Sequence, residues 1–234
     1  IDYGPCAFMD SFNKTQVFSS IDHAGRYSYG NQPQIVQWNL ARLAETLLPL
    51  IDKKQESAVE MAKEVIELYS ERFKEYWLSG MRRKIGLFIS EQEDENLIES
   101  LLNIMHENEA DFTLTFRSLS DTAFDSKNNR KIRNLFKDAG AFDNWSESWL
   151  SRLSCESTSP EERLKLMRKV NPAFIPRNHR VEQALNAAVE NLDYGPFEKL
   201  VDVLSSPYEE IKEKDEFMLP PKPGEHVLQT FCGT

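Results

Sequence analysis

The sequence predicts a mainly α-helical protein from residue 33 onward, and three observations support this prediction. Apolar residues recur every three or four positions through most of the chain, as on the buried face of a helix. After position 30, no alternating apolar–polar run typical of a strand exceeds a few residues. Serine, proline and glycine residues stand where helices would begin or end.

The first predicted helix covers residues 33–48. Asn31 precedes it as a candidate cap, and Pro33 suits a first turn because the N–H that proline lacks has no partner there. Pro49 marks its expected end. A second helix is predicted over about 53–78, with the next glycine in the chain, Gly80, ending it.

Two capping boxes predict further helix starts. Ser90 with Glu93 precedes one apolar run, and Ser159 with Glu162 precedes another, with Pro160 at the first helical position. The remaining periodic segments predict helices at 109–120, 128–138, 142–153, 178–190 and 194–205.

The two ends of the chain lack helical periodicity. Residues 1–32 are rich in Gly, Ser, Asp and aromatic residues, so we expect a long irregular loop, a kind of segment that is often functional. The tail from Lys212 contains a proline cluster and should be extended, held to the body by Phe217, Leu219 and Phe231. We therefore expect a loop over 1–32, a helical domain over 33–211 and a tail over 212–234.

Composition excludes several classes of function. The 234 residues carry 38 acids and 28 bases, a formal net charge of -10, which argues against binding to nucleic acid or anionic lipid. No apolar run approaches the length of a membrane span. The three cysteines lie far apart without metal-type spacing, which favours free thiols in a reducing compartment. We expect a monomer with no nucleic-acid or membrane partner.

The start of the chain is unusual, since Ile1 rather than Met opens it and no signal peptide follows. The run Ile1-Asp2-Tyr3-Gly4-Pro5 is typical of a strand that ends in a loop. We therefore expect this chain to be the C-terminal part of a longer protein.

Asp2 is the first candidate for chemistry. Protein kinases present an Asp shortly before a Gly to the magnesium ions that bridge the ATP phosphates. A carboxylate is the hard oxygen ligand that magnesium prefers. The alternative is an ordinary turn, because Asp, Gly and Pro also favour turns.

Two other stretches carry candidate residues. His23 beside Asp22 is a possible acid–base pair, but a structural role in the loop is favoured for both. Arg26 is a possible phosphate or carboxylate ligand, and a structural role explains it equally well. The run from Asn171-Pro172 to Arg177-Asn178 predicts a stiff connector, with Asn178 capping the next helix.

Taken together, these motifs resemble the C-terminal part of selenoprotein O and its bacterial relatives. The resemblance extends along essentially the whole chain. It rests on Ile1-Asp2-Tyr3-Gly4-Pro5, Asp22-His23-Ala24-Gly25-Arg26-Tyr27, Asn31-Gln32-Pro33, Trp38-Asn39-Leu40, Asn171-Pro172, Arg177-Asn178 and Cys232.

The resemblance implies a protein-kinase-like fold, a pseudokinase that transfers AMP from ATP to Ser, Thr or Tyr hydroxyls of proteins. It implies Mg²⁺ or Mn²⁺ as cofactor, with Asp2 as a metal ligand, and places the other catalytic groups upstream of this sequence. No catalytic residue in the strict sense is then expected here, and this chain alone should be inactive. Residues 6–32 would be the activation segment, and the helix from Pro33 would belong to a C-lobe. The location would be cytoplasmic in a bacterium, which we favour, or mitochondrial in a eukaryote.

The resemblance also implies a redox role for Cys232, which stands third from the end of the sequence. Its partner in relatives is a cysteine of the activation segment, but Phe18 occupies that position here, and Cys6 is the only cysteine in the segment. A Cys6–Cys232 disulfide and two free thiols both remain open. We expect Cys232 to be accessible and reactive, and Cys155 less so.

Two other functions are consistent with these residues. One is an all-α interaction module in which Asp2 is only a turn residue. The other is a true kinase that transfers phosphate instead of AMP.

Overall fold

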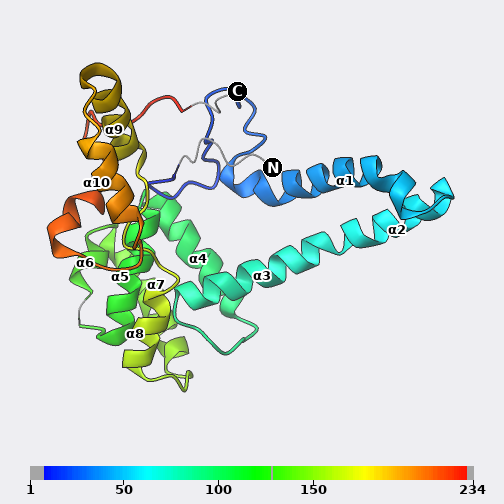
Figure 1. Ribbon diagram of the computed structural model, residues 1–234. Helices are drawn as coiled ribbons and strands as arrows, with labels where there is room; N and C mark the ends of the chain where they lie inside the picture. Colours follow the sequence, from blue (N-terminus) through cyan, green and yellow to red (C-terminus); the bar gives the residue numbers. More distant parts are fainter. Residues whose placement is uncertain (1–7, 128, 231–234) are drawn as a thin grey trace.

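The computed structural model describes residues 8–127 and 129–230, and the prediction of a mainly α fold is confirmed (Figure 1). Within these residues the only β-type pairing is an isolated bridge between Ser11 and Asp111. None of the helices there is long and apolar enough to cross a membrane. The helices are α1 (Gln32–Ile51), α2 (Gln55–Glu67), α3 (Tyr69–Lys84), α4 (Asp94–Glu107), α5 (Phe112–Phe124), α6 (Arg130–Arg133), α7 (Ala139–Leu153), α8 (Pro160–Arg168), α9 (Asn178–Asn191) and α10 (Gly195–Leu204), with short 3-10 helices η1 (Tyr29–Asn31) and η2 (Lys212–Phe217).

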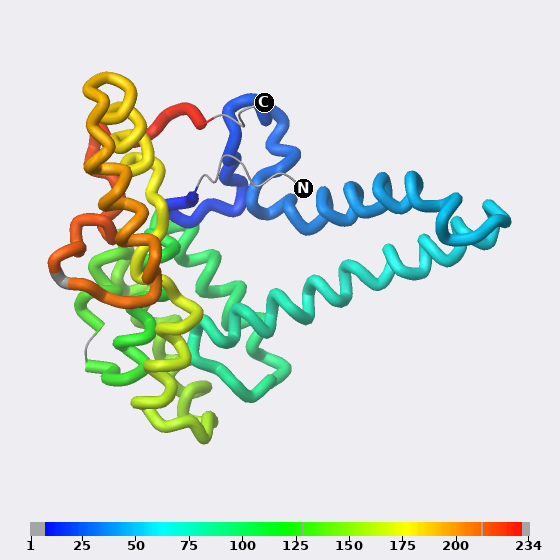
Figure 2. The backbone as a smooth tube through the Cα atoms, viewed as in Figure 1, coloured from blue at the N-terminus to red at the C-terminus, as the bar shows by residue number. Residues whose placement is uncertain are grey.

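Helices α1, α2 and α3 form an arm that stands away from the rest of the molecule (Figures 1 and 2). Helix α1 runs outward from the loop that precedes it, and α2 and α3 return to the body in nearly one line. Only Ala58 and Met81 are buried within these three helices. The arm therefore contributes little to the main core.

The main core lies where α4, α5 and α7 meet the end of α3. Trp149 of α7 is fully buried, and its indole Nε1 donates a hydrogen bond of 2.8 Å to the carbonyl of Ile85. Trp145 stacks on Trp149 and donates from its own Nε1 to the carbonyl of Leu97 in α4. Each buried indole thus has the polar partner that its burial requires.

A smaller apolar cluster joins the tail to the region of α9 and α10. It contains Phe174 and Val203, with Phe217 packed against them. The predicted contact of Phe217 is thereby confirmed, whereas Leu219 is largely exposed and Phe231 lies outside the described residues. The tail is not extended from Lys212 as expected, because η2 occupies its first six residues.

Several predicted helix ends are wrong. Helix α1 continues through Pro49 to Ile51, since a proline in the last turn removes only one backbone donor. The predicted helix over 53–78 is two helices that meet at Leu68, and Gly80 lies inside α3. Nothing approaches the Cβ position of Gly80, so this glycine does not mark a tight contact.

The capping predictions have mixed outcomes. Ser159 caps α8 as predicted, its hydroxyl accepting from the Glu162 amide. Asn31 does not cap α1; its side-chain amide donates to the carbonyl of Gly25 instead. The box expected from Ser90 does not form either, because Asp94 accepts from the Glu91 amide there.

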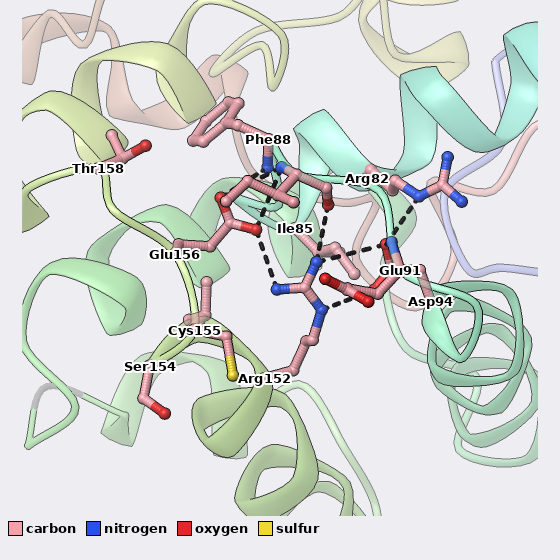
Figure 3. Close-up of polar contacts among 12 residues, drawn as sticks. Arg82, Ile85, Phe88, Glu91, Asp94, Arg152, Ser154, Cys155, Glu156 and Thr158 are labelled. Atoms are coloured by element: carbon pink, nitrogen blue, oxygen red, sulfur yellow. Dashed lines mark hydrogen bonds and ion pairs between the residues drawn. The ribbon is translucent and has the colours of Figure 1, made fainter.

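Asp94 is the centre of a buried ionic network that ties α3, α4 and α7 together (Figure 3). Its carboxylate is fully buried and accepts from Nε of Arg82 and Nε of Arg152, both at 2.8 Å. Arg152 also donates to Glu156 at 3.0 Å, and Glu156 accepts from the amide of Phe88 at 3.0 Å. Every charged group of this network therefore has an opposite partner.

We predict that Asp94→Asn lowers the free energy of unfolding by about 3 kcal/mol, because it leaves two arginines without their shared buried carboxylate. The matched control is Glu95→Gln, which removes a neighbouring acid paired with Lys74 at the surface and should cost less than about 1 kcal/mol. Urea unfolding of both variants measures the difference. Equal losses would contradict the assignment.

A second polar junction joins α3 to the connector that precedes α9. Asn171 is fully buried, and its amide donates to the carbonyl of Lys84 at 2.8 Å. Lys84 donates from Nζ to the carbonyl of Val170 and to the side chain of Asn171. Burial lowers the pKa of Lys84 to about 8 from its ordinary value of 10.5.

This pKa predicts the sign of a pH effect. Between pH 8 and 10.5 the unfolded chain binds the Lys84 proton and the folded chain does not, so the Lys84 contribution to the free energy of unfolding rises with pH there. The rise should amount to no more than about 3 kcal/mol. Urea unfolding at several pH values, compared with Lys84→Met, isolates it. A difference between the two proteins that is constant with pH would contradict the prediction.

Candidate functional site

The segment that follows Asp2 is fastened to the helical body. Asp2 and Cys6 lie outside the described residues, and the description starts at Phe8. The amide of Phe112 donates to the carbonyl of Asp10, and the amide of Phe12 donates to the carbonyl of Ala110, both at 2.8 Å. These bonds hold residues 10–12 along the start of α5.

Arg177 reinforces this attachment from the connector before α9. Its side chain is only 1% exposed. The guanidinium pairs with the carboxylates of Asp10 and Asp111, with 2.8 Å from Nη1 to Asp111, and donates from Nε to the carbonyl of Met218 at 2.9 Å. Burial disfavours the charge of Arg177, but the carboxylates of Asp111 and Asp10 outweigh it and raise the pKa of Arg177.

Asn178 holds the backbone of Phe8 by two hydrogen bonds. Its Oδ1 accepts from the Phe8 amide, and its Nδ2 donates to the Phe8 carbonyl, both at 3.1 Å. The prediction that Asn178 caps α9 is therefore wrong, since the residue before the helix is Arg177 and no side chain caps it. Arg177 and Asn178 instead connect the run before α9 to the segment after Asp2.

Asp10 and Asp111 were not among the predicted site residues. Asp111 is identifiable as a helix cap, because its side chain accepts from the Leu114 amide at the start of α5. No pattern in the sequence distinguishes Asp10 from other loop carboxylates. Its pairing with Arg177 depends on residues far apart in the chain.

In the loop around Asp22, the carboxylate of this residue binds the backbone of the loop itself. The two carboxylate oxygens of Asp22 accept from the amides of Arg26 and Tyr27, both at 2.8 Å. His23 is exposed and has no hydrogen bond or ion pair with any residue of the described part. The geometry thus favours the structural alternative for Asp22 and shows no acid–base pair with His23.

Arg26 is also held by neighbouring side chains. Its guanidinium lies 4.4 Å from the ring centroid of Trp38, and the guanidinium of Arg42 lies 5.4 Å from the same ring. This stacking explains how the loop is attached to the root of α1. The stacking does not test whether Arg26 binds an anion, so that role stays a prediction.

The tail returns to the same loop. The Ser20 amide donates to the carbonyl of Thr230, and the Thr230 hydroxyl donates to the carbonyl of Phe18 at 2.7 Å. Cys232 lies outside the described residues, so its redox role and its bond to Cys6 stay predictions. Cys155 is exposed and free.

Two cavities lie near these residues. One of about 240 Å³ is bounded by Phe8, Asn178 and residues of the 16–20 and 227–230 segments, and it is smaller than typical ligand sites. The other, of about 760 Å³, lies between α9 and the tail. Its lining includes the carboxylates of Glu182 and Glu225, whose negative charge disfavours binding of a polyphosphate such as that of ATP. Among the residues described, no group of three or more His, Cys, Asp or Glu side chains could hold a metal ion.

We predict that Asn178→Ala increases amide exchange at Phe8 about tenfold, because the variant removes both hydrogen bonds to that residue. Asn186→Ala, an exposed change in the same helix, is the control and should leave the exchange of Phe8 unaltered. Hydrogen exchange followed by mass spectrometry measures both. Unchanged exchange in Asn178→Ala would show that the two bonds do not protect the segment.

Comparison with known proteins identifies the family. The model of the family described as protein adenylyltransferase SelO matches residues 1–205. A protein named "Protein nucleotidyltransferase YdiU" from Rhizobium etli is 55% identical over all 234 residues, which cover 47% of its length. Proteins of the same name from Rhizobium meliloti and Rhodopseudomonas palustris are 53% and 50% identical, again over the whole chain and 48% of their length. The chain thus spans about half the length of these relatives, and it belongs to the protein adenylyltransferase SelO family.

Proposed function

We propose that this chain is part of a protein adenylyltransferase that transfers AMP from ATP to Ser, Thr or Tyr hydroxyls of proteins. In this reaction the hydroxyl oxygen bonds to the α-phosphorus, the bond to the β-phosphate breaks, and pyrophosphate leaves. The family match and the naming of the relatives as protein nucleotidyltransferases support the proposal. Bacterial relatives favour a cytoplasmic location.

Asp2 is the proposed metal ligand. Its carboxylate is a hard oxygen donor that suits Mg²⁺ or Mn²⁺, and such an ion would offset the charge of the ATP phosphates. The local sequence Asp2-Tyr3-Gly4-Pro5 supports this role through its position ahead of a well-anchored segment.

The observation that carries the proposal is the attachment of the chain shortly after Asp2. Asn178 binds the backbone of Phe8, and Arg177 binds Asp10, so the chain has a defined position from the sixth residue after the proposed metal ligand onward. Catalytic ligands need such support, because small displacements cost large factors in rate. A turn residue without function would not require it.

We also propose three parts with different roles. Residues 1–32 act as an activation-segment-like loop, residues 33–211 as a domain like a kinase C-lobe, and residues 212–234 as a tail. The hydrogen bonds between Thr230 and the 18–20 segment support a link between the tail and the loop. ATP and hydroxyl-bearing proteins are the proposed partners.

The test joins this chain to the part of the Rhizobium etli relative that it does not match. We expect the fusion to transfer label from α-labelled ATP to proteins, and Asp2→Ala to reduce this transfer at least about a hundredfold, because the metal loses an anionic ligand. Mass spectrometry of the products distinguishes AMP from phosphate. A folded fusion that transfers only phosphate would support a kinase and contradict the proposal.

The chain contains a matched control. The tetrapeptide recurs as Asp193-Tyr194-Gly195-Pro196, where the Asp193 carboxylate accepts from the Gly195 amide at the start of α10. Asp193→Ala should therefore leave AMP transfer within about twofold of the parent. Near-normal transfer by a folded Asp2→Ala protein would contradict the role of Asp2.

A further inference from the structure

One side of α1 carries an apolar stripe that is exposed from Leu43 to Leu50 and half-buried at Val36 and Leu40, nearer the body. Another side of α1 packs on the rest of the arm. Gln37 donates to the carbonyl of Ile66 and accepts from the Ser70 hydroxyl, so the side of α1 that carries Gln37 faces α2 and α3. The stripe lies about a quarter turn away and includes Leu50, which is 82% exposed. Its members follow each other at spacings of four and three residues: Val36, Leu40, Leu43, Leu47 and Leu50.

A second stripe lies on α2. Met61, Val65 and Leu68 follow each other at the same spacing, and Val65 is 66% exposed. The buried residue Ala58 marks the side of α2 that faces α1. Measured from that side, Met61, Val65 and Leu68 are displaced by about 60°, 20° and 80°, all in the same sense as the stripe of α1 and by less than a quarter turn.

The two stripes lie on the same side of the arm. Each is rotated in the same sense about its own helix axis, away from the side that faces the other helix. Because α1 and α2 pack together and run in opposite directions, rotations in the same sense bring the stripes to one side (Figure 2). We call this surface the arm face, made of Val36, Leu40, Leu43, Leu47, Leu50, Met61, Val65 and Leu68.

We infer that the arm face is the docking surface for the part of the family's protein that lies outside this sequence. An exposed apolar surface without a charged side chain in its stripes is typical of an interface. The relatives contain about as much chain again as they share with this sequence, so they contain the polypeptide to cover it. The family membership, and not AMP transfer, carries this inference.

A second copy of the chain is a less suitable occupant. Each copy has a formal charge of -10, which opposes self-association. The arm face also continues from the loop that follows Asp2, because α1 begins where that loop ends. On the proposed function, the rest of the protein must approach this loop to complete the site, which brings it to the root of α1.

The experiment mixes this 234-residue chain with the separately produced part of the Rhizobium etli protein that it does not match. We expect a one-to-one complex in size-exclusion chromatography with light scattering. The triple variant Leu43→Glu, Leu47→Glu, Leu50→Glu should weaken binding at least about tenfold, since it places charges on the arm face. Circular dichroism verifies that the variant keeps its helices.

The matched control places three glutamates on another exposed apolar set, Leu185→Glu, Val189→Glu and Leu192→Glu, in and just after α9. This variant should bind within about threefold of the parent. Absence of any complex, equal weakening by both variants, or a dimer of the chain that the arm-face variant dissociates would each overturn the inference. A complex that forms with the unmodified chain but transfers no AMP to proteins would contradict the proposed function alone.

Discussion

The ion pairs and hydrogen bonds of Arg177 are the interactions on which the arrangement of the described parts of the loop and the tail depends. A buried positive charge is tolerated only where opposite charges and hydrogen-bond acceptors surround it, and Arg177 obtains these from three separate segments. Asp10 comes from the loop, Asp111 from the start of α5, and the carbonyl of Met218 from the tail. Removing any one of them leaves part of a buried charge without a partner. The loop, the helical body and the tail are therefore positioned together.

This constraint connects the fold to the proposed chemistry. From Phe8 to Ser28 the loop forms no helix and pairs with the body only through the isolated bridge at Ser11, so its position depends on a few backbone and side-chain hydrogen bonds to the body. Asn178 binds the Phe8 backbone directly, and the tail reaches the same loop through Thr230 and Ser20. The body thus supports the loop that follows the proposed metal ligand, and rigid helices often support functional loops in this way.

The arm has a different physical character from the body. The body buries tryptophans and pairs the buried carboxylate of Asp94 with two arginines (Figure 3). The arm exposes leucines along α1 and buries few of its residues. Packing of α1 on α2 buries little apolar surface and so stabilises the pair only weakly. The inferred docking of another polypeptide accounts for the exposed apolar side of the arm.

The sequence by itself determined the helical class, the family resemblance and the local features that depend on near neighbours, such as the cap at Ser159. These follow from periodicity and from groups a few residues apart, which the order of residues makes visible. Only the tertiary structure decided that Asn178 binds Phe8 instead of capping α9, and that Asp10 meets Arg177. It also decided that the Gln37 side of α1 faces α2 and α3, whereas Leu43, Leu47 and Leu50 stay exposed. Such contacts join residues distant in the chain, and their energies depend on burial that arises only when the whole chain has folded.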